Sequence, residues 1–267
     1  MRVNNKWLAV LLLVGLVSLS GCNLPVVKKL RARDYLNKGV TQFTNQKYDA
    51  AAQFFQKSLE LDPSFEIARM YQATAYMNQF IPGSGDPRSE QNAERAIETF
   101  KQVVANAEAS GEPNINAMIS IVSLYFQMKK YDESKEWCDR VLKVDANNAE
   151  AYYRVAVMEY DQIIEKTGLQ GDRVKDMSPE EINELRERIE EGLSYVSRAL
   201  KTRENYHEAM EYQNLLWREK AKLETDETAK AELIRQADMV ALESSKMRRK
   251  AQEEAARRPK VATRKSE

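Results

Sequence analysis

Histidine, cysteine, glycine and proline are scarce in this chain, and each scarcity excludes a class of protein. The 267 residues include one histidine, His207, so a zinc site built on two histidines is impossible. The two cysteines, Cys22 and Cys138, cannot form a disulfide framework. With 9 glycines, 7 prolines and 31% charged residues, the composition is typical of a helix-rich protein with mixed-charge surfaces, rather than a disordered or all-β chain.

An excess of charge of one sign is also lacking. Lys+Arg and Asp+Glu both number 41, so net charge predicts neither nucleic-acid wrapping nor an acidic partner. The stretch from Lys246 to Lys265 is locally basic, and it offers contacts to anionic lipid or nucleic acid. We interpret it as a solvated helix end, because cations stabilise the C-terminal turns of helices. We therefore expect no nucleic-acid partner.

The N-terminus carries a short apolar run behind a positive start. Arg2 and Lys6 are followed by a nearly all-apolar segment of about thirteen residues, too short for the roughly 20 that a membrane-spanning helix needs. A charged start, a short apolar run and small residues before a cut mark a secretory signal. The sequence Leu19-Ser20-Gly21-Cys22 that ends this run resembles the lipobox of bacterial lipoproteins.

The lipobox resemblance implies that residues 1–21 are removed and that Cys22 becomes the lipidated first residue, followed by a linker at 22–31. A buried acyl chain contributes about 0.8 kcal/mol per methylene, so two or three chains, palmitate among them, would anchor the protein stably. Asn23 replaces the Asp that favours inner-membrane retention in enterobacterial sorting. It implies an outer-membrane location facing the periplasm. The alternative is an ordinary signal peptide with an incidental cysteine.

Two segments share a helix–turn–helix pattern with a period of about 34 residues. The first carries Tyr35, Gly39, Phe43, Tyr48, Ala51, Phe55, Leu59 and Pro63, and the other carries Ile115, Ile121, Tyr125, Tyr131, Ser134, Val141 and Leu142. These positions resemble the tetratricopeptide repeat, in which small residues such as Gly39 and Ala51 let paired helices approach closely.

This resemblance implies an all-α solenoid of about five helix pairs over residues 32–256. The second and fourth copies are interrupted by polar, turn-rich insertions at 81–92 and 167–178. The last helix is expected to cap the array, and residues 257–267 to form a basic disordered tail.

First helices line the concave groove of such arrays and decide what they bind. By the family pattern, the lining positions are apolar, aromatic or methionine-containing, suited to an extended or helical peptide segment. Each of them has an equally plausible alternative role as core. The positions are Leu36, Val40, Phe43, Met70, Thr74, Met77, Asn116, Ile119, Phe126, Tyr153, Val157 and Tyr160.

No residue pattern indicates catalysis, a metal or a cofactor. Cys138 is expected to be an inert core thiol, and His207 a surface or packing residue. Adjacent acidic residues on a helix point about 100° apart and do not converge on a substrate.

The sequence therefore favours a non-catalytic, membrane-anchored adaptor that binds envelope proteins through its groove. Lipoproteins of the β-barrel assembly machinery, and those that assist pilus secretins, share this combination and are alternatives. A third alternative is a lipoprotein of unassigned role. A further one is an envelope glycan hydrolase, which needs two carboxyl groups about 5 to 10 Å apart in a cleft.

Overall fold

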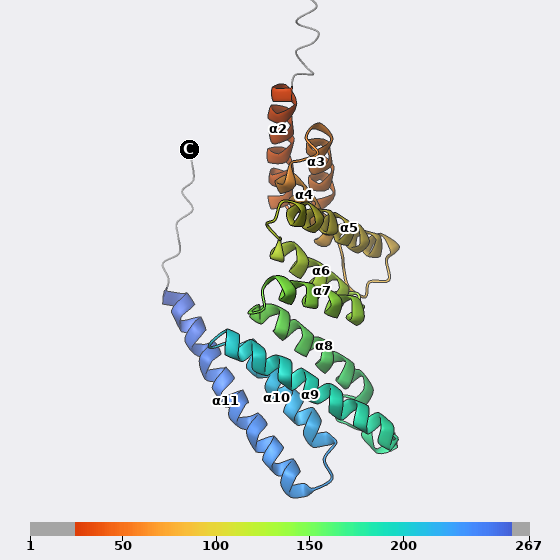
Figure 1. Cartoon of the computed structure of the whole chain (residues 1–267), viewed down its shortest axis with the longest axis vertical. Coiled ribbons are helices and arrows are strands. Elements are labelled where there is room, and N and C mark those ends of the chain that lie inside the picture. The colour runs from red at the N-terminus through yellow and green to blue at the C-terminus, as the bar shows by residue number, and fades with distance from the viewer. Residues whose placement is uncertain (1–24, 258–267) are drawn as a thin grey trace, which may run out of the picture. The chain divides into compact units, whose positions relative to one another are not determined.

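The computed structural model describes residues 25–257 and holds ten α-helices and no strand in that range (Figure 1). The predicted all-α architecture of consecutive helix pairs is confirmed. The leader, Cys22 and residues 258–267 lie outside the described range. The helices are α2 Pro25–Thr44, α3 Tyr48–Leu61, α4 Glu66–Met77, α5 Pro87–Ala109, α6 Ile115–Gln127, α7 Tyr131–Val144, α8 Ala149–Thr167, α9 Pro179–Thr202, α10 His207–Lys222 and α11 Glu227–Arg257.

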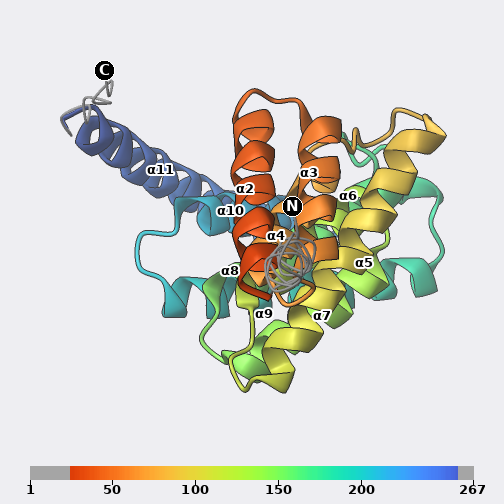
Figure 2. The same cartoon turned by 90° about the horizontal axis from the view of Figure 1, so that it is seen from above.

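The chain divides into two compact units at the turn between α6 and α7, residues 1–130 and 131–267. In the first unit α2 packs on α3, α3 on α4, α4 on α5 and α5 on α6. Figure 1 and Figure 2 both show α2 beside α3. In the second unit α7 packs on α8, α8 on α9, α9 on α10 and α10 on α11. In residues 25–257 no helix is both long and apolar enough to cross a bilayer.

Local capping signals set several helix starts. Ser178 accepts a hydrogen bond from the Glu181 backbone N–H, and the Glu181 carboxylate accepts one from the Ser178 backbone N–H, completing a capping box. Pro179 occupies the first turn, where its missing N–H costs nothing. Asp86 caps α5 by accepting a hydrogen bond from the Arg88 backbone N–H at 3.0 Å, and Pro87 follows it in the first turn. These signals explain why both inserted loops end sharply in a helix.

Two predicted boundaries differ from the structure. Helix α2 begins at Pro25, so the segment expected as a linker at 22–31 is helical from that residue on. Proline is favourable in a first turn, and no glycine or further proline occurs between residues 26 and 38. Helix α5 begins at Pro87, so only the first half of the 81–92 insertion is loop. Buried Ser89 holds that loop, because its hydroxyl accepts from the Ile81 N–H at 2.7 Å.

The core of the first unit depends on close contact between α2 and α3. Gly39 faces the fully buried ring of Phe55, and a β-carbon at Gly39 would lie 2.4 Å from that ring. Ala51 and Ala52 extend the same contact. The predicted role of Gly39 in close helix approach is confirmed by this geometry.

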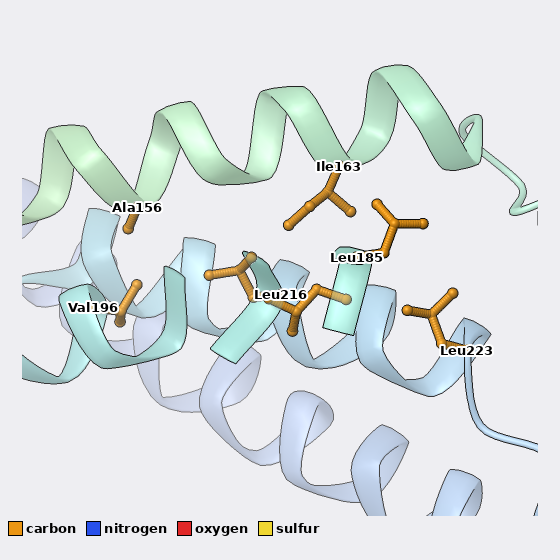
Figure 3. Close-up of a cluster of buried hydrophobic side chains, with 7 residues drawn as sticks. Ala156, Ile163, Leu185, Val196, Leu216 and Leu223 are labelled. Atoms are coloured by element: carbon orange, nitrogen blue, oxygen red, sulfur yellow. The ribbon is translucent and has the colours of Figure 1, made fainter. Parts of the chain in front are cut away.

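The core of the second unit joins α8, α9 and α10. Figure 3 shows their aliphatic side chains pointing toward one another. Val174 and Met177, from the inserted loop, pack against this cluster. The insertion therefore covers one end of the core. The buried members of the cluster are Ala156, Ile163, Leu185, Ile189, Val196, Leu216 and Leu223.

Buried polar groups fasten the inserted 167–178 segment to α10. The Thr167 hydroxyl donates to the Glu219 carboxylate at 3.1 Å, and that carboxylate pairs with Lys222 Nζ at 2.7 Å. Lys222 Nζ also donates to the Leu169 carbonyl at 3.0 Å. Both Thr167 and Glu219 are almost fully buried, so each needs the partner it has.

Candidate functional site

An apolar groove in the first unit is the candidate binding site. Its cavity of about 340 Å³ lies along α4, with Phe43 of α2 and Val103 of α5 at its sides. Ile67, Met70 and Tyr71 supply the floor and rim, and Ile67 is 57% exposed. An exposed isoleucine beside a hollow is the arrangement expected of an interaction surface.

Polar groups mark the edge of this groove. The lining includes Glu66, Thr74 and Asn114. Glu66 Oε1 accepts from Arg69 Nε at 3.3 Å and from Asn106 Nδ2 at 2.8 Å, which holds the carboxylate at the rim. An apolar centre with a few polar groups at its edge suits a peptide whose main chain also needs hydrogen-bond partners.

Stacked aromatic rings hold the groove in shape. Tyr71 stacks on the buried ring of Phe55, with centroids 5.5 Å apart, and meets Phe43 edge-on at 6.0 Å. Phe43 also contacts Tyr48 edge-on at 5.3 Å. The groove wall is therefore an extension of the α2–α3 core, and a change in that core would alter the groove.

The structure brings together three of the predicted lining residues of the first unit, namely Phe43, Met70 and Thr74. Leu36 and Val40 pack against the α2–α3 core instead. The other predicted positions lie elsewhere on α4 and α6: Met77, Ile119 and Phe126 are half-buried, and Asn116 is exposed.

Sequence reasoning missed five of the eight residues that line the groove, namely Glu66, Ile67, Tyr71, Val103 and Asn114. Ile67 and Tyr71 lie four residues apart on α4, and so project on the same side as Met70 and Thr74. The i, i+3, i+4, i+7 spacing of these four residues indicated a shared helix face. The repeat pattern, however, gives Tyr71 a packing role.

In the second unit, the predicted residues Tyr153 and Tyr160 meet other tyrosines. Both rings lie 5.5 Å from the ring of Tyr212 on α10, and Tyr153 also lies 5.2 Å from Tyr206. Val157 belongs to the buried core. These α8 positions are thus partly covered by α10, whereas the groove of the first unit is open.

Burial makes this tyrosine cluster hard to ionise. It raises the pKa of Tyr153 to about 12, with a smaller contribution from Tyr212, and it raises the pKa of Tyr160 and Tyr212. The Tyr206 hydroxyl donates to Glu150 at 2.7 Å, and burial together with this bond raises the pKa of Tyr206. In the unfolded chain a tyrosine titrates near pH 10.

We expect the protein to lose stability at alkaline pH through these tyrosines. The stabilisation from Tyr153 is complete below about pH 10, where both states are protonated, and it is lost as pH rises toward about 12. At pH 11 the loss for this one group is about 1 kcal/mol. Urea unfolding at pH 8 and pH 11 measures it. Tyr153→Phe should lose less stability between the two pH values than the parent, and equal losses would contradict the assignment.

Cys138 lies in the core, as expected, and His207 is half-buried at the start of α10. Cys138 is fully buried, and burial raises the pKa of its thiol to about 12, so it is protonated and unreactive at neutral pH. His207 begins α10, and its carbonyl accepts from the Ser244 hydroxyl of α11 at 3.0 Å. Among the described residues no cluster of three or more His, Cys, Asp and Glu is placed to hold a metal.

Family models match two segments of the chain. The segments are 32–65, which includes most of α2 and all of α3, and 115–148, which includes α6 and α7. Both models describe the tetratricopeptide repeat. The two segments are tetratricopeptide repeats. No curated protein matches the sequence.

Solved structures support the fold. A MamA crystal structure superposes with a TM-score of 0.57 at 14% identity, over 82% of this chain and 94% of that one. MamA from Desulfovibrio magneticus RS-1 superposes with a TM-score of 0.54 at 13% identity, over 82% of this chain and 96% of that one. A further MamA crystal structure has a TM-score of 0.53 at 16% identity, over 79% of this chain and 96% of that one. At such identities the likeness concerns fold alone. Tetratricopeptide-repeat folds are typical of scaffolds that bind other proteins.

Proposed function

We propose that this chain is a lipid-anchored tetratricopeptide-repeat scaffold of the bacterial cell envelope. It holds partner proteins near the membrane through the apolar groove of its first unit and catalyses no reaction. The groove is the observation that carries the proposal, because it combines an open apolar surface with a repeat fold suited to binding peptide segments.

The shape of the groove supports a segment with spaced apolar side chains as its ligand. Ile67, Met70 and Tyr71 offer contacts along one side of α4, and methionine adapts to different side chains. Thr74 and Asn114 offer polar partners for the ligand. An amphipathic helix or an extended strand with apolar anchors every three or four residues meets these demands.

The lipobox supports the membrane anchor and the envelope location. Cys22 follows Leu19-Ser20-Gly21, and Asn23 supports transfer to the outer membrane, facing the periplasm. The glycan-hydrolase alternative gains no support from the groove. A single carboxylate, that of Glu66, lines it, whereas that chemistry needs a pair.

In-cell crosslinking of the tagged full-length protein, followed by mass spectrometry of the membrane fraction, tests the groove. Replacing Ile67 and Met70 by glutamate puts two charges in the apolar cavity, and we expect at least a tenfold loss of crosslinked partner, because an unpaired charge is costly to bury. Ile81→Glu is the matched control, since Ile81 is 64% exposed and does not line the groove. It should leave partner capture unchanged.

Equal capture by the groove variant and the Ile81 control would sink the groove as the binding site. Recovery of glycan in place of a stoichiometric protein would sink the adaptor function itself.

Cys22→Ala tests the anchor separately. Mass spectrometry of the N-terminal peptide from the parent should show acyl chains on Cys22, and the variant should retain residues 1–21 without acylation. A parent peptide cut at Cys22 but carrying no lipid would contradict the anchor.

A further inference from the structure

The first two turns of α2 carry two exposed apolar side chains that the fold leaves unused. Val26 is 68% exposed and Leu30 is 60% exposed. They lie four residues apart on the helix, so they project from the same side. The core uses a different side of α2, where Ala32 and Gly39 are fully buried. Val26 and Leu30 therefore face away from the packed interior.

Four exposed cations lie on the same stretch of α2: Lys29 and Arg33 flank the apolar pair, and Lys28 and Arg31 project from other sides of the helix. All four side chains are exposed, and no acidic residue occurs in α2 before Asp34. Asp34 is already paired with Lys38 at 2.7 Å. Within the described part of the chain none of the four cations forms an ion pair.

Exposed aliphatic side chains among unpaired cations fit one kind of surface particularly well. In a bilayer with anionic lipids, apolar side chains enter the boundary between headgroups and acyl chains while lysine and arginine contact the phosphates. Each lysine or arginine near an anionic bilayer strengthens binding to that bilayer by about fivefold. A nucleic acid would use the cations but would leave Val26 and Leu30 in water.

The position of this segment in the chain points to the same occupant. Asn23 and Leu24 alone separate Cys22 from Pro25, and an extended chain spans at most about 3.6 Å per residue. With lipid on Cys22, the start of α2 therefore lies within about 11 Å of the anchored residue. This step rests on the proposed lipidation, whereas the exposed pair and the cations do not.

We propose that Val26, Leu30 and the four cations form a docking surface for an anionic lipid bilayer, here named the α2 membrane face. Acyl chains alone do not fix the orientation of a protein at the membrane. The α2 membrane face would add a second contact beside the anchor and so limit the orientations of α2 at the membrane.

Vesicle co-sedimentation of the unlipidated mature chain tests the α2 membrane face apart from the anchor. Residues 22–267 with Cys22→Ser contain every described helix. We expect binding to vesicles of phosphatidylglycerol with phosphatidylcholine, weaker binding at high salt, and little binding to phosphatidylcholine alone. Lys29→Glu/Arg33→Glu should weaken binding at least tenfold. Val26→Ser/Leu30→Ser should weaken it several-fold.

Lys246→Glu/Lys250→Glu on α11 is the matched control. It changes the net charge equally, at the same spacing on an exposed helix, and should bind vesicles like the parent. Circular dichroism checks that each variant remains helical. Binding lost equally in this control, or kept in both α2 variants, would overturn the proposal. So would loss in the charge variant with none in Val26→Ser/Leu30→Ser, because that pattern indicates a polyanion rather than a bilayer.

The two proposals can fail separately. Vesicle binding by the Cys22→Ser chain, with no acyl group found on Cys22 in cells, would keep the α2 membrane face and remove the anchor. Acylated Cys22 with no vesicle binding would do the reverse.

Discussion

Replacing Lys135 and Arg188 together by methionine is expected to lower the free energy of unfolding by about 3–5 kcal/mol. Both cations pair with Glu159, Arg188 at 2.6 Å and Lys135 at 3.2 Å. The Glu159 side chain is 1% exposed, whereas the two cations are about one-third exposed. Without them a buried carboxylate has lost its charged partners, which is far more costly than losing an exposed ion pair.

A hydrogen bond from Lys135 to Glu191 at 2.7 Å extends the network to a further acid on α9. Burial alone would lower the pKa of Lys135, but its bonds to Glu191 and Glu159 outweigh burial and raise it. The ammonium group is therefore charged throughout the neutral range. The network ties α7, α8 and α9 together through these charges.

Chemical denaturation of the double variant measures the loss, and a third substitution checks its cause. Adding Glu159→Gln removes the buried charge, so the triple variant should recover at least about 1–2 kcal/mol relative to the double variant. A double variant within 1 kcal/mol of the parent would show that the network contributes little. A triple variant no more stable than the double would show that lost packing, rather than an unpaired charge, is the cause.

Phe55→Ala is expected to lower the free energy of unfolding by about 3–5 kcal/mol. The substitution leaves a cavity where the fully buried Phe55 ring packs between α2, α3 and α4. The loss should also loosen Tyr71, whose ring stacks on Phe55, and so weaken partner binding in the groove. Thermal or urea unfolding measures the first effect, and the crosslinking assay described for Ile67 and Met70 measures the second.

The effect of Gly39→Ala on the free energy of unfolding should change sign between the parent and the Phe55→Ala background. In the parent it should lower the free energy of unfolding by about 1–3 kcal/mol, because the new β-carbon meets the fully buried Phe55 ring at 2.4 Å and forces it to shift within the core. In the Phe55→Ala background the obstacle is gone, and the helix preference for alanine over glycine should make the change neutral or stabilising by up to about 1 kcal/mol. Losses of the same size in both backgrounds would contradict close packing at Gly39.

The helix pairs were largely predictable from the sequence because their signals are local. Tyr48, a residue of the repeat pattern, begins α3, and the predicted insertion at 167–178 ends where Ser178 caps α9. The start of α2 was not predictable, since the polar and apolar residues of 25–31 do not follow a clear helical period. Their helix continues from a packed segment, which supplies the nucleus that a short isolated helix lacks.

The groove was only partly predictable. The repeat pattern pointed to Phe43 and Met70, which line the cavity, but it assigns residues by their place in the repeat. The exposure of a side chain depends on how far the next helix covers it. Ile67, which was not predicted, remains open, whereas Tyr153, a predicted lining residue on α8, is partly covered by Tyr206 and Tyr212.

By itself the sequence determined the all-helical class and the repeat period, since each depends on residues within a few positions of one another. The tertiary structure alone decided that Glu159 is a buried ion-pair centre rather than part of a solvated face. It also decided that Val26 and Leu30 remain outside the core. Burial depends on contacts between helices that lie far apart in the chain, and helical periodicity carries no information about those contacts.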